Sequence, residues 1–155
     1  MKKISLEFED IIGRYFNLKV KKHNYRIYVE EAGKGTPLLC LHTAGSDGRQ
    51  FRHILNDKKI TNNYRVIVFD LPWHGKSNPP EGYELNDYKL TTNLYKQIIM
   101  SFCKQYELKA PVIMGCSMGG RVVLHLALEQ SNYFKAVIAL EGADKLEPYY
   151  DLDWL

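Results

Sequence analysis

The segment Met114–Gly120 reads MGCSMGG, and its one hydroxyl group is surrounded by small residues. Gly115, Ser117 and Gly119 fit the pattern G-x-S-x-G. An apolar run over 110–115 precedes the serine, and apolar residues at helical spacing follow it. Between a strand and a helix, this pattern predicts a tight turn that strains the serine backbone and exposes its hydroxyl as a nucleophile.

The same turn predicts where a developing negative charge would be held. Glycines on either side of Ser117 remove the Cβ atoms that would clash where strand and helix close on each other. The amide of Met118 falls at a helix N-terminus, where it can face an oxyanion. A second donor is expected from the small-residue loop LHTAGSDGR, with Thr43 or Ala44 supplying the backbone amide.

The elements that must position these groups alternate along the chain. Short apolar runs without alternation are typical of strands buried on both faces, and helical patterns lie between them. Four such strands are predicted, at Pro37–His42, Tyr64–Asp70, Ala110–Gly115 and Lys135–Gly142. Two alternating strands, about 15–21 and 25–31, come first and are joined by a turn at His23-Asn24.

Helices are expected over 50–56, from a cap at Asn86 or Asp87 to about residue 106, and directly after Ser117. The alternation predicts an α/β fold, a mainly parallel sheet with helices on both faces and strand order 1-2-4-3-5-6. Loops 42–49, 70–78 and 115–120 each follow a strand, so they should meet at one edge of the sheet.

Three motifs in this order resemble the α/β-hydrolase superfamily, and the resemblance runs from the opening hairpin to Glu141. They are an oxyanion loop at His42–Gly45, the D-x-P-x-x-G-x-S loop at Asp70–Ser77, and the G-x-S-x-G turn. The motifs are specific for the superfamily and say little about the substrate. The oxyanion loop departs from the family pattern, because it reads His-Thr-Ala-Gly where His-Gly is commoner. Thr43 narrows the space for a substrate carbonyl.

The resemblance implies a catalytic triad in the chain order serine, acid, histidine. Glu141 follows Ser117 at the end of the next predicted strand, the position at which haloalkane-dehalogenase-like members carry the acid. Most members carry it one strand later. Glu141 is therefore expected to be the acid or a supporting carboxylate, or else to cap a loop by binding backbone amides; Asp144 lies three residues further on.

The general base is expected to be absent from this chain. Only His125 follows Ser117, and two turns of helix carry it about 12 Å along the axis. The resemblance to the family implies a structural role for His42. His74 is expected to orient a loop or face solvent. His23 and His53 look like surface residues. The expected domain is thus the N-terminal part of a hydrolase, residues 1–155, truncated before its closing strands and cap; a naturally short module is the alternative.

The composition of the chain narrows the possible classes of function and location. The chain has 155 residues, a net charge of +3 and scattered basic residues, which argue against nucleic-acid binding. No apolar stretch reaches the roughly 20 residues of a membrane span, and no signal-peptide core follows the first lysines, which predicts a cytoplasmic protein. Three unevenly spaced cysteines predict reduced thiols, and neither a metal nor another cofactor is expected.

Two functions from different classes remain. The first is a serine hydrolase acting on a small carboxylic ester or a related acyl compound, such as a thioester or lactone, with this chain inactive on its own. The second is a non-catalytic ligand-binding or interaction module on the same scaffold. The last predicted strand would leave an open apolar edge, through which two copies could pair.

Overall fold

The computed structural model describes residues 8–85 and 88–142. Its elements, in chain order, are β1 (Ile12–Val20), β2 (His23–Ala32), β3 (Thr36–Leu41), the 3-10 helix η1 (Gly48–Phe51), α1 (Arg52–Asn56), α2 (Lys58–Thr61), β4 (Tyr64–Phe69), α3 (Thr92–Gln105), β5 (Val112–Cys116), α4 (Met118–Glu129) and β6 (Ala136–Leu140). No described helix has both the length and the apolar character needed to cross a membrane.

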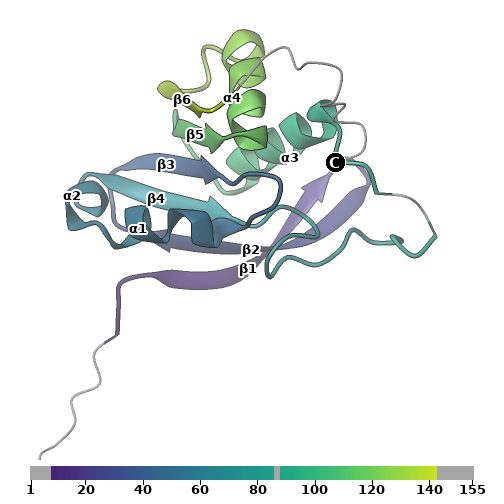
Figure 1. Ribbon diagram of the computed structural model, residues 1–155, viewed down its shortest axis with the longest axis horizontal. Coiled ribbons are helices and arrows are strands. Elements are labelled where there is room, and N and C mark those ends of the chain that lie inside the picture. Colours follow the sequence, from purple (N-terminus) through teal and green to yellow (C-terminus); the bar gives the residue numbers. More distant parts are fainter. Residues whose placement is uncertain (1–7, 86–87, 143–155) are drawn as a thin grey trace, which may run out of the picture.

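The six strands form one sheet in the order β1-β2-β4-β3-β5-β6, which confirms the predicted order. The β1–β2 hairpin is antiparallel and β2 pairs antiparallel with β4, whereas β3, β4, β5 and β6 run parallel. The loops after β3, β4 and β5 therefore leave the sheet at the same edge, as predicted (Figure 1).

Successive residues of the central strands pack into two different cores. Leu39, Ile67 and Ile113 belong to the larger core, which includes residues of α3 and α4. Leu38, Val66 and Val112 belong to the smaller core, with residues of η1 and α1. Both faces of β3, β4 and β5 are thus covered, which explains why these strands read as continuous apolar runs.

Two predicted boundaries were wrong. The hairpin turns at Lys21-Lys22 and not at His23-Asn24, because Val20 pairs with His23 and Leu18 pairs with Tyr25. This register places Leu18, Val20 and Tyr25 in the interior, and burial of one face fixes strand register more strongly than local polarity does.

The long helix α3 begins at Thr92, later than the predicted cap at Asn86 or Asp87, which lie outside the described residues. Thr91 caps it by accepting a hydrogen bond from the Leu94 amide at 3.2 Å, and threonine is a competent N-cap residue. The short helix α2, capped by Asp57, was not predicted.

Strand β6 is not buried as its sequence suggested. In the described part of the chain it pairs only with β5, and Ile138 and Leu140 remain 40% and 43% exposed. The predicted open apolar edge is therefore present among the described residues.

Candidate active site

Ser117 occupies a strained turn between β5 and α4. Its φ of 53° and ψ of −111° lie in a region that residues with a Cβ rarely adopt, and its side chain is exposed. The Ser117 amide donates to the Leu140 carbonyl at 2.8 Å, which fixes the serine against the end of β6. The predicted backbone strain is confirmed.

The three glycines around the serine are needed for close backbone packing. A Cβ on Gly115 would collide with the Gly119 carbonyl, and a Cβ on Gly119 would lie 2.6 Å from the Leu41 carbonyl oxygen. A Cβ on Gly120 would lie 2.6 Å from the Leu140 carbonyl oxygen. Substituting any of them would push the first turn of α4 away from β3, β5 or β6.

Helix α4 begins at Met118, so its first amides have no acceptor within the helix. The first turn closes where the Arg121 amide donates to the Ser117 carbonyl at 2.8 Å. The Met118 amide is thereby left at the positive end of the helix dipole, directly after the strained serine. Backbone amides at the N-terminus of a helix can donate to an anion.

His42 fixes the geometry of the loop that follows β3. It is fully buried, its Nε2 accepts from the Leu71 amide at 3.1 Å, and its Nδ1 lies 2.8 Å from the Thr43 carbonyl. Because Nε2 accepts, Nδ1 carries the proton and donates to Thr43. Burial lowers the pKa of His42, which keeps the ring neutral in this role.

The structure separates the two candidate donors of this loop. The Thr43 amide already donates to Gln50 Oε1 at 3.0 Å. Within the described residues the Ala44 amide has no hydrogen-bond acceptor, so it is the one still available to a substrate. Gly119 packs against the carbonyls of Leu41 and His42, which brings the first turn of α4 against the start of this loop.

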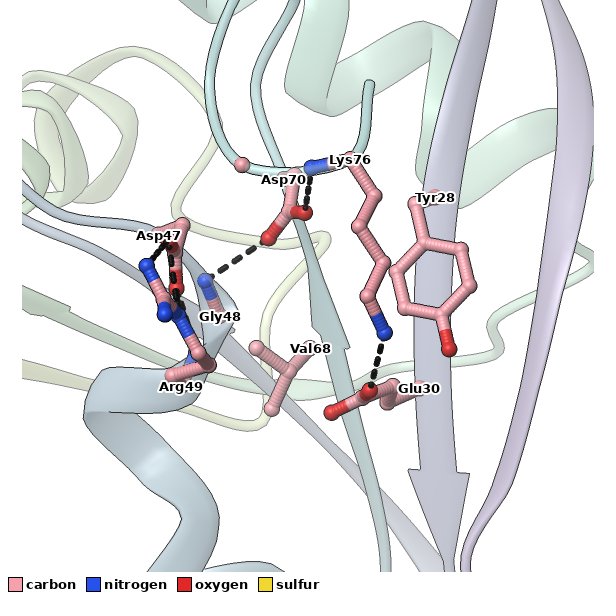
Figure 2. Close-up of a pocket in the computed structure, with 9 residues that line it drawn as sticks. Tyr28, Glu30, Asp47, Gly48, Arg49, Val68, Asp70 and Lys76 are labelled. Atoms are coloured by element: carbon pink, nitrogen blue, oxygen red, sulfur yellow. Dashed lines mark hydrogen bonds and ion pairs between the residues drawn. The ribbon is translucent and has the colours of Figure 1, made fainter.

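Asp70 ties the loop after β4 to the loop after β3. Its carboxylate accepts from the amides of Gly48 and Lys76, both at 2.7 Å, as Figure 2 shows. Its carbonyl accepts from the Ser77 hydroxyl at 2.7 Å. Gly75 has a φ of 50° and leaves no room for a Cβ beside the Asp70 carboxylate, so this position of the motif favours glycine.

Asp47 holds the beginning of η1. Its carboxylate caps the helix by accepting from the Arg49 amide at 2.9 Å and pairs with the Arg49 guanidinium. Hydrogen bonding to the Arg49 side chain lowers the pKa of Asp47 to about 2. The Asp-x-Arg spacing was visible in the sequence but was not recognised as a cap.

Glu141 directly follows β6, beside the serine turn. Cys116 is paired with Leu140, so the residues that follow them, Ser117 and Glu141, leave neighbouring strands at the same level. Glu141 is exposed and, like Ser117, has a left-handed backbone with φ of 51°. Asp144, the second carboxylate considered from the sequence, lies outside the described residues.

The histidines are placed as follows. His42 and His74 lie in the loops after β3 and β4, with 5.0 Å between their ring centroids. His125 is half-buried on α4, eight residues after Ser117, and His23 and His53 are exposed. The contacts of His74 were missed by sequence reasoning: its Nε2 lies 3.1 Å from the Ala44 carbonyl and its Nδ1 lies 3.0 Å from the Pro72 carbonyl.

Two cavities adjoin these loops. The first, of about 230 Å³, lies between β2, β4 and η1 and is the one in Figure 2. Its lining residues are Tyr28, Glu30, Asp47, Gly48, Arg49, Val68, Asp70, Gly75 and Lys76. The second is an open groove of about 720 Å³ between residues 45–53 and 73–75. Ser117 lines neither of them.

Comparison with known proteins shows the family. The family model described as the alpha/beta hydrolase fold matches residues 36–154, and the chain belongs to this family. The 30 kDa subunit of magnesium chelatase from Rhodobacter capsulatus is 33% identical over 95 residues, which cover 61% of this chain and 31% of that protein.

Two further similar proteins have names that refer to acyl compounds. The pimeloyl-[acyl-carrier protein] methyl ester esterase of Vibrio cholerae is 24% identical over 77% of this chain and 42% of its own. The structure of the N-acyl homoserine lactonase AidH is similar with a TM-score of 0.67 and 28% identity, over 81% of this chain and 44% of that one. The chain spans less than half the length of each of these proteins.

Proposed function

We propose that this chain carries the nucleophile and oxyanion site of a serine hydrolase that acts on a carboxylic ester or a related acyl compound. The observation that carries the proposal is the strained, exposed Ser117 at the N-terminus of α4. Family relatives that include esterases support hydrolase chemistry in general terms.

The proposed roles follow from the geometry. The Ser117 oxygen attacks the substrate carbonyl carbon while its proton passes to a base, and the amides of Met118 and Ala44 donate to the resulting oxyanion. When this intermediate collapses, the bond to the leaving oxygen breaks, the base returns its proton to that oxygen, a neutral alcohol departs and an acyl group remains on Ser117. Water then releases the acid and restores the serine hydroxyl.

Glu141 is proposed as the carboxylate that orients the base. Its place beside Ser117 at the end of β6 supports this role. The base itself is proposed to be a histidine other than the five of this chain. His42 is buried and hydrogen-bonded through both ring nitrogens, His125 is about 12 Å along α4, and the nitrogens of His74 face two backbone carbonyls.

The test uses a fluorophosphonate, which transfers its phosphonyl group to an activated serine and loses fluoride. We expect the 155-residue chain to be labelled slowly on the peptide that contains Ser117, and added imidazole to accelerate labelling by supplying the missing base. Ser117→Ala should abolish this labelling, whereas Ser131→Ala, at another exposed serine, should not change it.

Hydrolysis of p-nitrophenyl acetate gives a second measure. Without a base, we expect turnover at least about 10³-fold below the roughly 10 per second of a working esterase. Labelling that is unaffected by Ser117→Ala would reject the hydrolase and favour the non-catalytic binding module. Rapid turnover without imidazole would instead show that this chain contains its own base.

A further inference from the structure

The short segment Thr43–Gly45 is held by side chains that lie outside it. Gln50 in η1 accepts the Thr43 amide at 3.0 Å, and His74 in the loop after β4 faces the Ala44 carbonyl at 3.1 Å. The two contacts lie on successive residues and come from two different elements. They therefore restrain both ends of the peptide unit that carries the Ala44 amide.

The direction of the Ala44 amide follows from that peptide unit. The Thr43 carbonyl accepts from His42 Nδ1 at 2.8 Å and from the Ser46 amide at 3.2 Å. No peptide bond in the described residues is cis, and in a planar trans peptide the N–H points opposite to the carbonyl. The Ala44 amide is therefore directed away from His42 and Ser46.

We propose that Gln50 and His74 are positioning residues that select the Ala44 amide as the oxyanion donor, an inference that rests on the function proposed above. Gln50 binds the competing Thr43 amide, which removes it from the site. His74 holds the carbonyl of Ala44, so that the loop cannot rotate its amide out of the site. Neither side chain touches the reacting atoms.

The contacts of His74 determine which ring nitrogen must carry the proton. Its two ring nitrogens face two carbonyls, at Pro72 and at Ala44, and a carbonyl can only accept. A neutral imidazole carries a single proton. Of the two neutral tautomers, only the one protonated on Nε2 can donate to the Ala44 carbonyl.

The first experiment measures this tautomer and the loop amides by ¹⁵N NMR on the 155-residue chain. We expect the proton of the neutral His74 ring on Nε2. We also expect Gln50→Ala to increase hydrogen exchange at the Thr43 amide about 2- to 10-fold, as loss of one hydrogen bond implies. Gln50→Glu keeps an acceptor oxygen and should restore protection. A proton on Nδ1, or unchanged exchange at Thr43, would overturn the proposal.

The second experiment measures the rate of fluorophosphonate labelling at Ser117 with imidazole present. His74→Leu should slow labelling by about 10- to 100-fold, as a displaced donor implies, and His74→Gln, which can still donate, should recover part of the rate. His53→Ala is the control, because His53 lines the same groove without an observed bond to residues 43–45. Thermal melts confirm that each variant is folded.

The two proposals fail in different ways. If wild-type Ser117 is not labelled, the hydrolase proposal fails, while the tautomer and exchange measurements still decide how the loop is held. If the wild-type chain is labelled and His74→Leu is labelled equally fast, the positioning role is rejected and the hydrolase proposal stands. The same holds if His53→Ala is labelled as slowly as His74→Leu.

Discussion

The two sides of the serine turn are held by different kinds of interaction. Toward β4, the loops after β3 and β4 are joined by side chains: Asp70 binds the Gly48 amide, and His42 binds the Leu71 amide. Toward β6, Ser117 is held by one backbone hydrogen bond to Leu140 and by contacts between glycines. The loop after β3 is thus fixed by its own surroundings, whereas the serine depends on β6, which is an edge strand within residues 8–85 and 88–142.

The sheet edges differ in the same way. At the β1 edge, Arg14 of β1 pairs with Glu31 of β2, and the Arg26 guanidinium of β2 lies 3.3 Å from the ring centroid of Tyr15 of β1. At the β6 edge, the exposed side chains are apolar. Charged edges resist pairing with other strands, and apolar edges invite it.

The largest expected effect on stability comes from a substitution at Gly119, in the first turn of α4. Gly119→Val should prevent folding or cost more than about 4 kcal/mol, because its Cβ would lie 2.6 Å from the Leu41 carbonyl oxygen. Gly45→Ala is the control, since a Cβ there has no neighbour within 4 Å. Urea denaturation of both variants measures the difference, and equal stability would contradict the packing described for the turn.

The edge comparison predicts self-association through β6. We propose that two copies pair along this strand, so that Ile138→Lys should shift the chain toward monomer by placing a charge at the edge. Ile12→Lys is the matched change on β1, at an isoleucine that is 53% exposed, and should have little effect. Sedimentation velocity over a range of concentrations tests this, and an equal effect of both variants would reject it.

The smallest expected effect depends on pH and concerns the β4 side. Burial lowers the pKa of His42 from its ordinary value of 6.5, so the unfolded chain binds this proton more readily than the folded one. Stability should therefore fall as the pH drops below 6.5, by at most about 1.4 kcal/mol per pH unit.

Urea denaturation between about pH 7 and pH 5 measures this slope, because an ordinary histidine titrates in that range. His42→Asn should be less stable at neutral pH but should lose this part of the slope. Asp47 affects stability in a separate pH range. Because its pKa is lowered to about 2, its contribution to folding stability is lost only as the pH falls from 3.8 toward 2. An unchanged slope in His42→Asn would contradict the neutral, buried role of this ring.

The individual buried strands and the serine turn were predictable because each rests on residues close together in sequence. Apolar runs marked the strands, and the spacing of Gly115, Ser117 and Gly119 marked the turn. The contact between His74 and Ala44 was not predictable, since it joins the loops after β4 and β3, whose approach depends on the packed sheet. Polarity at His23-Asn24 was misleading because burial of Leu18 and Tyr25 sets the hairpin register.

The hydrogen bond between the Ser117 amide and the Leu140 carbonyl links the lifetime of the serine's conformation to the opening of β6. When an edge strand frays, the groups it holds are released together, and edge strands open more readily than central ones. Each excursion of β6 would let Ser117 leave its left-handed backbone for an ordinary one. The exchange rate of a single amide proton, that of Ser117, therefore reports how much of the time this serine holds its strained backbone conformation.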